Sequence, residues 1–149
     1  MTYLLRDFPD PPFKKGDKLI FQDFGPLKSN TFVAILEQNY EFLESVLDIM
    51  EIEAPKQEKI PIGDLVINQI ISCQWSEDKN WYRALVKQVC LEKKKVKVRF
   101  VDFGNSADEP VENIRELPES AVEFPVLGKL VNLDGVESVP IKDVVVKNK

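Results

Sequence analysis

The chain has 149 residues, of which 44% are hydrophobic and 30% charged, a size that fits one domain or a small module set into another. This apolar content supplies a folded core and excludes intrinsic disorder. The net charge of −5 argues against a protein that grips phosphates, because such a protein needs a surplus of Lys and Arg, and it favours a cationic partner.

We expect neither a metal site nor a cofactor. The sequence contains no His, and its two cysteines, Cys73 and Cys90, lack metal-ligand spacing. Both are expected to be buried free thiols in a reducing compartment. The N-terminus lacks the apolar stretch of a signal peptide, and no segment approaches the ~18 apolar residues that span a membrane. These features predict a soluble intracellular protein.

The first part of the chain predicts short elements and one helix. A proline-rich stretch at 8–13 is expected to be extended or loop-like, and strands are predicted at 18–22 and 30–38. Apolar residues then recur at helical spacing over 40–52. Asn39 is the expected N-cap of this helix, and the proline that follows Ala54 is expected to end it.

After Gly63 the pattern becomes dense β. Turn-forming clusters separate the predicted strands, which lie at 65–67, 70–75, 81–90, 95–102 and 106–110. Several short strands at regular spacing indicate a small barrel, because an open sheet of this size would leave exposed edges. Short apolar pieces beyond residue 118 predict further strands at 121–124, 126–133 and 139–146.

Four aromatic residues lie beside the turns that connect these strands: Trp75, Tyr82, Phe100 and Phe103. Phe100 and Phe103 have opposite parity along a strand, so a turn must return Phe103 to the side of Phe100, and Gly104 permits such a turn. A cation over a desolvated aromatic face gains ~2 kcal/mol or more, so a group of rings suits a cationic guest. Aromatic residues in a small barrel are more often core, and the rings alone leave both interpretations open.

Asn105 adds a fixed amide that can hydrogen-bond a guanidinium N–H. A methylated guanidinium stays planar and charged while it loses donors. A narrow slot between parallel rings would therefore fit methylarginine better than a bulky trimethylammonium group.

Two linked motifs favour a binding site over a core. The segments 75–84 (Trp-Ser-Glu-Asp-Lys-Asn-Trp-Tyr-Arg-Ala) and 98–105 (Val-Arg-Phe-Val-Asp-Phe-Gly-Asn) resemble the signature of Tudor domains. The resemblance is greatest to the extended Tudor domains of germline Tudor proteins and of the Tudor–staphylococcal-nuclease protein. It implies a methylarginine cage in which Asn105 contacts the guanidinium and the walls are Trp75, Tyr82, Phe100 and Phe103. Trp75 is larger than the usual Phe or Tyr, and the turn after it is one residue longer than usual.

The resemblance also implies a mainly β fold, in which a small five-stranded Tudor barrel is inserted in a partial OB or staphylococcal-nuclease-like module with one connecting helix. Residues 1–62 would form the first part of the nuclease-like module with its linker helix. Residues 63–118 would form the barrel, and residues 119–149 a short return into the nuclease-like module.

In functional terms, the resemblance implies a reader and not an enzyme. It would bind symmetric dimethylarginine in an Arg/Gly-rich peptide of a Piwi/Argonaute-class partner and act as a scaffold in piRNA silencing, in a cytoplasmic, perinuclear germ granule. The sequence holds no nucleophile elbow or phosphate-cradling loop that would support catalysis. Two alternatives stay open: a methylation-independent protein-interaction scaffold, and a single-stranded RNA-binding module, which the acidic charge disfavours.

The acidic residues near the motifs admit two interpretations each. Asp102 is expected to support the turn or to pair with Arg83 across strands, and the alternative is a contribution to a peptide groove. Asp108, Glu109 and Glu112 are expected to be solvated, unless they line that groove.

Overall fold

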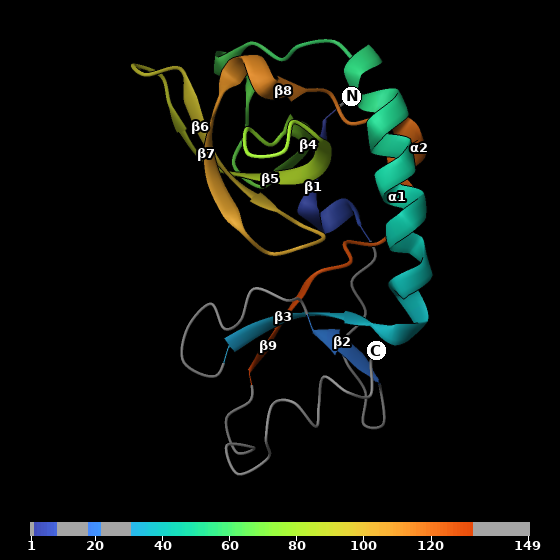
Figure 1. Ribbon diagram of the computed structural model, residues 1–149. Helices are drawn as coiled ribbons and strands as arrows, with labels where there is room; N and C mark the ends of the chain where they lie inside the picture. Colours follow the sequence, from blue (N-terminus) through green and yellow to red (C-terminus); the bar gives the residue numbers. More distant parts are fainter. Residues whose placement is uncertain (1, 9–17, 22–30, 133–149) are drawn as a thin grey trace.

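The computed structural model describes residues 2–8, 18–21 and 31–132, which form two antiparallel sheets beside one long helix (Figure 1). The predicted strand at 139–146 and most of the proline-rich stretch at 8–13 lie outside the described residues.

The larger sheet curls into a five-stranded barrel, which supports the mainly β fold predicted from the sequence. Its strands are β4 (Gln69–Gln74), β5 (Trp81–Cys90), β6 (Lys95–Phe100), β7 (Ser106–Pro110) and β8 (Ile114–Arg115). The first four form an antiparallel meander, and a single 3-10 turn after β7 brings β8 back to pair with β4. A bulge in β5 adds twist, which helps the sheet to curl.

Strand alternation builds the interior of the barrel. In β6, for example, Val96 and Val98 are buried while Lys95 and Lys97 are exposed, the period of two expected of a strand with one buried face. The buried residues of this core are Ile60, Ile71, Cys73, Ala84, Val86, Val96, Val98, Phe100 and Ile114.

The smaller sheet joins segments that are far apart in the sequence. Its middle strand, β3 (Thr31–Leu36), pairs with β2 (Leu19–Phe21) on one side and with β9 (Lys129–Asn132) on the other. Figure 1 shows this sheet below the barrel, with the long helix α1 (Tyr40–Glu53) running along one side of the molecule from the small sheet to the barrel. A further short strand, β1 (Tyr3–Leu4), pairs with β4 of the barrel.

Helix α1 begins and ends close to the predicted residues. Its inward stripe buries Val46 and Met50, as the helical spacing indicated. Asn39 occupies the N-cap position, but its side chain makes no capping hydrogen bond, and a 3-10 turn precedes the helix instead. A second 3-10 turn (Ala54–Lys56) takes over where the proline was expected to end the helix.

Two of the predicted strands are wrong. Residues 65–67 form a loop, because the Gln69 side chain accepts the Val66 N–H at 3.0 Å and Asn68 adopts a left-handed φ of 73°. Residues 121–124 fall in and after a short helix, α2 (Glu119–Val122), whose buried Ala121 packs in the core shared with α1. Both segments are apolar enough to read as strands, but tertiary contacts give them other conformations.

The expectation of a buried free thiol is confirmed for Cys73, and the expected burial is wrong for Cys90. Cys73 and Cys90 are both free, but Cys73 alone is buried and Cys90 is half-buried.

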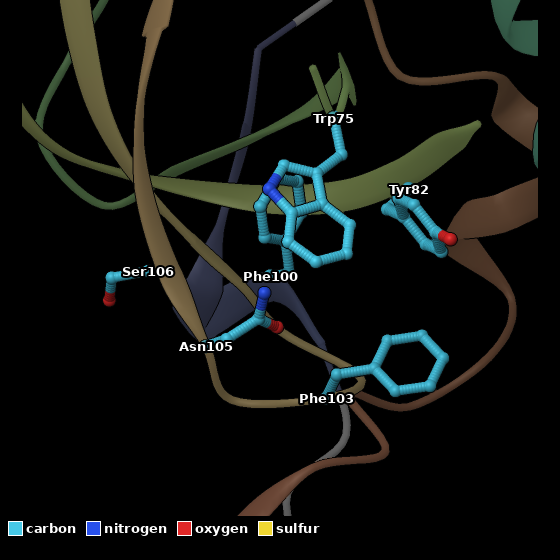
Figure 2. Close-up of a pocket in the computed structure, with 6 residues that line it drawn as sticks. All are labelled: Trp75, Tyr82, Phe100, Phe103, Asn105 and Ser106. Carbon is cyan, nitrogen blue, oxygen red and sulfur yellow. The ribbon is translucent and has the colours of Figure 1, made fainter. Parts of the chain in front are cut away.

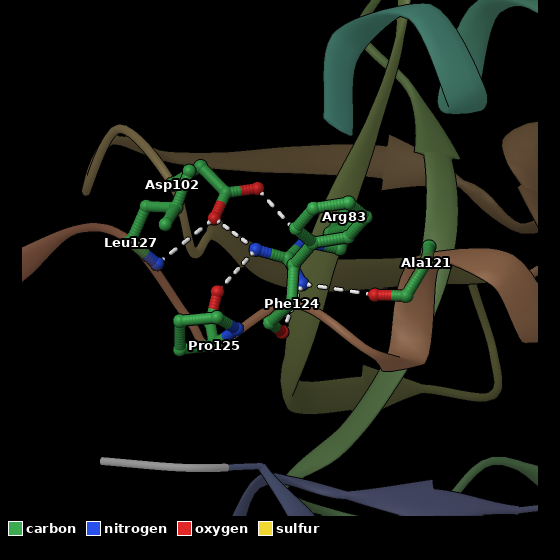
Figure 3. A network of polar contacts seen from close by, with 6 residues as sticks. All are labelled: Arg83, Asp102, Ala121, Phe124, Pro125 and Leu127. Carbon is green, nitrogen blue, oxygen red and sulfur yellow. Dashed lines mark hydrogen bonds and ion pairs between the residues drawn. The ribbon is translucent and has the colours of Figure 1, made fainter. Parts of the chain in front are cut away.

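A buried guanidinium connects the barrel to the segment that follows it (Figure 3). Arg83 in β5 is 1% exposed, and each of its five N–H donors is used. Nε and Nη2 bind the carboxylate of Asp102 at 2.9 and 2.5 Å. The other donors reach the backbone carbonyls of Ala121, Phe124 and Pro125 at 2.8–3.1 Å. The Arg83 side chain therefore connects β5 to a segment about 40 residues later in the chain.

Asp102 completes this network. It is 3% exposed and also accepts the backbone N–H of Leu127 at 3.0 Å. The side chain therefore pairs with Arg83, as one of the two sequence interpretations proposed, and it is too buried to present a surface to a peptide.

Two glycines allow close approach between the barrel and the small sheet. Gly104 has a φ of +90°, and a Cβ there would lie 2.1 Å from Cγ2 of Val33 in β3. A Cβ on Gly128 would lie 2.7 Å from the carbonyl oxygen of Val101, to which the Gly128 N–H donates at 3.0 Å. The turn after β6 is thus packed directly on the second sheet.

Replacing Asp102 with Asn is expected to lower the free energy of unfolding by about 3–5 kcal/mol, because it leaves the buried Arg83 charge uncompensated. Urea unfolding followed by circular dichroism measures this. The control is Glu53→Gln, which removes an exposed pair with Lys56 at 3.5 Å and is expected to change stability by less than ~0.5 kcal/mol. Equal effects of the two substitutions would contradict the importance of the buried pair.

Gly104→Ala is expected to lower the free energy of unfolding by roughly 1–3 kcal/mol, since the added methyl group overlaps Val33 and the left-handed φ is strained for Ala. Gly63→Ala serves as the control, because a Cβ there meets nothing within 4 Å. Thermal unfolding of the two variants compares them, and an unaffected Gly104→Ala protein would show that this contact is loose.

Candidate functional site

A cavity of about 410 Å³ lies at one end of the barrel (Figure 2). Its lining consists of Trp75, Tyr82, Phe100, Phe103, Asn105 and Ser106. The structure therefore brings together all five residues that the sequence singled out as a cage. Ser106 was not among them, although it directly follows Asn105 in the chain. We call this cavity the aromatic cup.

The meander explains why these residues meet. Trp75 directly follows β4, and Tyr82 is the second residue of β5. Phe100 is the last residue of β6, and Ser106 is the first of β7. Because neighbouring strands are antiparallel, the end of one lies beside the start of the next, and all these positions fall at the same end of the barrel.

A tight turn returns Phe103 to the side of Phe100, as the sequence predicted. The N–H groups of Phe103 and Gly104 both donate to the carbonyl of Phe100, at 3.1 and 2.6 Å. The Phe100 N–H in turn donates to the carbonyl of Asn105 at 2.8 Å. Gly104 supplies the positive φ that this turn requires.

The rings that touch one another are tilted or perpendicular, which differs from the expected slot between parallel rings. Tyr82 lies 6.4 Å from Trp75, 5.6 Å from Phe100 and 5.6 Å from Phe103, between ring centroids, at interplanar angles of 71–88°. Trp75 and Phe100 are 5.9 Å apart at 54°. Such edge-to-face contacts are favourable for aromatic pairs. They hold the rings in place around the cavity.

The lining residues divide into a floor and walls. Phe100 is 1% exposed and belongs to the barrel core, whereas the other aromatic residues and Asn105 are only partly buried. Figure 2 shows the Asn105 amide pointing into the space between Trp75 and Phe103. The lining residues include no carboxylate and no Lys or Arg. Four aromatic side chains and one amide equip the cavity to bind an alkylated cation.

A carboxylate behind one wall restrains Tyr82. The Tyr82 hydroxyl donates a hydrogen bond to Asp78. Burial and this hydrogen bond raise the pKa of Tyr82 to about 12, so the phenol stays neutral at physiological pH. Asp78 also accepts the Asn80 N–H at 2.9 Å, which folds its own turn. Asp78 was missed in the sequence, where its position four residues before Tyr82, across a short turn, was the available signal.

The acidic residues after the second motif do not share one environment. Asp108 and Glu112 are exposed, as expected. Glu109 is 1% exposed, and the expectation of a solvated side chain is wrong for it. In β7 the odd-numbered positions face the barrel interior, so Glu109 points inward with Ala107.

Across the described part of the chain, no group of three or more metal-ligating side chains is placed to hold an ion. No helix in the same residues has the length and apolar character to cross a bilayer.

Comparison with known proteins agrees with this geometry. Residues 22–135 match the family model of the Tudor domain. The chain is 34% identical over 83 residues to human Tudor domain-containing protein 1, covering 55% of this chain and 7% of that protein. It is 37% identical over 51 residues to Tudor domain-containing protein 1 of Oryzias latipes, covering 34% of this chain and 4% of that protein. The chain thus spans only a small part of these relatives.

Solved structures share the fold. A crystal structure of Tudor in complex with Aubergine [R15(me2s)] has a TM-score of 0.64 and 27% identity, covering 80% of this chain and 69% of that one. Extended Tudor domain TD3 of mouse TDRD1, solved with a MILI peptide containing dimethylarginine 45, has a TM-score of 0.68 and 19% identity, covering 83% and 62%. The second likeness shows the fold alone. Since the family model covers more than half of the chain and the fold is that of solved extended Tudor domains, the chain belongs to the Tudor domain family.

Proposed function

We propose that this chain is a methylarginine reader that holds the dimethylated guanidinium of a peptide in the aromatic cup. The observation that carries the proposal is the cup itself, in which four rings and one amide surround an open space of about 410 Å³. The lining holds no carboxylate, His or Lys that could act as a general base for the hydroxyls of Tyr82 and Ser106, and we propose an activity of binding without chemistry.

The cup matches the chemistry of the guest. Dimethylation leaves the guanidinium flat and positively charged, and it replaces N–H donors by methyl groups. Ring faces attract the charge by ~0.5–1 kcal/mol when exposed and ~2 or more when desolvated. The Asn105 side-chain oxygen can accept a remaining N–H, while the apolar walls need no donor from the guest.

Negative charge around the cup would draw in a cationic peptide. Asp78 and Glu51 both lie close enough to Tyr82 to raise its pKa through their charges, and neither lines the cavity. The chain as a whole carries a charge of −5. Such a field speeds the approach of Arg-rich segments at low salt, so we propose an Arg/Gly-rich peptide as the ligand.

Two solved relatives support a more specific proposal about the ligand. The Tudor structure at 27% identity was solved in complex with Aubergine dimethylated at R15, and the mouse domain with a MILI peptide. By this analogy the ligand carries symmetric dimethylarginine and comes from a Piwi/Argonaute-class protein. The setting would be piRNA silencing in a cytoplasmic germ granule, where the chain acts as a scaffold.

Binding of single-stranded RNA is the second candidate. Its supporting observation is a cluster of exposed lysines, Lys93, Lys95 and Lys97, around a hollow beside the β5–β6 hairpin. This hairpin lies at the opposite end of the strands from the cup. Single-strand readers combine a basic track with stacking rings, and here the two features are separated, which favours the peptide.

Calorimetric titration with three peptides of one Arg/Gly-rich sequence tests the proposal. The unmodified peptide is expected to bind at least about tenfold more weakly than the symmetrically dimethylated one, because its extra N–H donors would go unsatisfied in the cup. The asymmetrically dimethylated peptide is expected to lie between them. Equal affinities would identify a methylation-independent scaffold, and salt-sensitive RNA binding without peptide binding would identify an RNA module.

Alanine substitution of the walls tests the assignment of the site. Phe103→Ala and Tyr82→Ala are each expected to weaken binding of the dimethylated peptide by about tenfold or more, since each removes a ring face. Tyr40→Ala is the control, because Tyr40 is an exposed ring on α1 outside the cup. Phe100→Ala is unsuitable as a test of binding, since loss of this ring would leave a cavity in the barrel core and destabilise the fold. Unchanged affinity in both wall variants would show that the peptide binds elsewhere.

A further inference from the structure

We propose that the buried side chain of Glu109, together with Asn113, is a positioning device for Trp75 and thereby sets how tightly the cup holds a methylated arginine. The effect on affinity rests on the proposed function, whereas the positioning of Trp75 does not. We call Glu109, Asn113 and Ser76 the Trp75 clamp.

Three hydrogen bonds converge on the two oxygens of Glu109. Oε2 accepts both the backbone N–H and the hydroxyl of Ser76, each at 3.1 Å. Oε1 accepts the side-chain amide of Asn113 at 3.3 Å. Ser76 directly follows Trp75, and Asn113 lies in the 3-10 turn after β7. The carboxylate thus connects the segment that carries Trp75 to the turn between β7 and β8.

The clamp grips the chain on both sides of Trp75. The same Asn113 amide donates to the carbonyl of Gln74 at 3.2 Å, while Glu109 holds the N–H of Ser76. Trp75 itself is tied within its turn, because its N–H donates to Asn80 at 2.9 Å and its carbonyl accepts from Lys79 at 2.7 Å. These bonds restrain the backbone dihedrals on which the direction of the indole depends.

Trp75 needs such restraint. β4 ends at Gln74, so Trp75 lies beyond the strand, and its backbone is bonded to Asn80 and Lys79 of the turn. Its ring is partly exposed and touches Tyr82 and Phe100 at tilted angles. A binding group is useful only when it is held within about 0.5 Å of its productive geometry, and this precision depends on the residues behind it.

The burial of Glu109 has no simpler explanation in packing. Fully buried carboxylates are rare, and an apolar residue would fill an inward-facing position of β7 at lower cost. The neighbouring Ala107 packs on the barrel core in that way. Glu109 also reaches far inward: the pKa of the Cys73 thiol is raised mainly by burial of the thiol and additionally by the charge of Glu109. Within the described residues, the hydrogen bonds of its side chain go to Ser76, next to Trp75, and to Asn113.

Glu109→Gln tests the clamp with little change of shape. A glutamine offers one oxygen and two N–H donors where the clamp presents three donors, so at least one of the hydrogen bonds that join residue 109, Ser76, Asn113 and Gln74 must break. The matched control is Asp108→Asn, which makes the same change of charge at an exposed position of the same strand. The first readout is the indole N–H resonance of Trp75 in the free protein, assigned with Trp75→Phe and compared with that of the buried Trp81.

We expect Glu109→Gln to shift or broaden the Trp75 resonance while the Trp81 resonance stays in place, and Asp108→Asn to change neither. The symmetrically dimethylated peptide is expected to bind Glu109→Gln on the order of tenfold more weakly, the value of about one hydrogen bond to a charged group. Asp108→Asn is expected to bind as the unsubstituted chain does.

A double-mutant cycle separates positioning from general destabilisation. In a Trp75→Ala background, Glu109→Gln is expected to cause no further loss of affinity, because the wall that it positions is gone. An equal loss in both backgrounds, or an unmoved Trp75 resonance, would overturn the proposal. If Glu109→Gln does not fold, Ser76→Ala removes one side-chain contact of the clamp and Asn113→Ala removes two, and both variants are judged by the same two criteria.

Failure of the two proposals can be told apart. If the unsubstituted chain binds none of the peptides, the proposed function is wrong, but the Trp75 resonance in the free protein still decides whether the clamp exists. If the chain binds the methylated peptide and the resonance does not respond to Glu109→Gln, the clamp alone is wrong.

Discussion

The ion pair between Arg83 and Asp102 is the constraint on which the rest of the structure depends. A buried guanidinium is tolerated only when its charge and all its donors are matched, and here one carboxylate and three backbone carbonyls match them. The carbonyls belong to the segment after the barrel, and the carboxylate begins the turn that carries Phe103 and Asn105. The same pair therefore fixes the position of the segment 121–125 against the barrel, and it fixes the start of the turn that carries Phe103 and Asn105 of the aromatic cup.

The cup gains its rigidity from secondary structure, since its residues lie at or beside the ends of barrel strands, apart from Phe103 in the turn between β6 and β7. Edge-to-face contacts between the rings and a turn tied to Phe100 hold the walls before any guest arrives. Preorganisation of this kind reduces the ordering cost that binding must overcome. The close approach of Gly104 to Val33 extends this support to the second sheet.

The carboxylates nearest the cup lie behind its walls and not inside it. Asp78 restrains Tyr82, and Glu109 restrains the chain around Trp75. A carboxylate inside the cavity would form charge-assisted hydrogen bonds to every free guanidinium N–H and would reward an unmodified arginine. With the negative charge placed outside, the cup can attract a cation at long range and still favour the alkylated form at contact.

By itself the sequence determined the features that depend on local pattern. The β pattern and its turn clusters predicted strands at 81–90 and 106–110, and the resemblance of two motifs to the Tudor signature implied the five residues that the structure gathers in the cup. Only the tertiary structure decided what depends on distant partners. Residues 121–124 do not form a strand, and the carbonyls of Ala121 and Phe124 accept hydrogen bonds from Arg83. Asp102 forms a buried ion pair and does not line a groove. Glu109 is buried because donors from two other segments of the chain bind its carboxylate. Local propensity cannot register such contacts, since the partners lie tens of residues away in the chain.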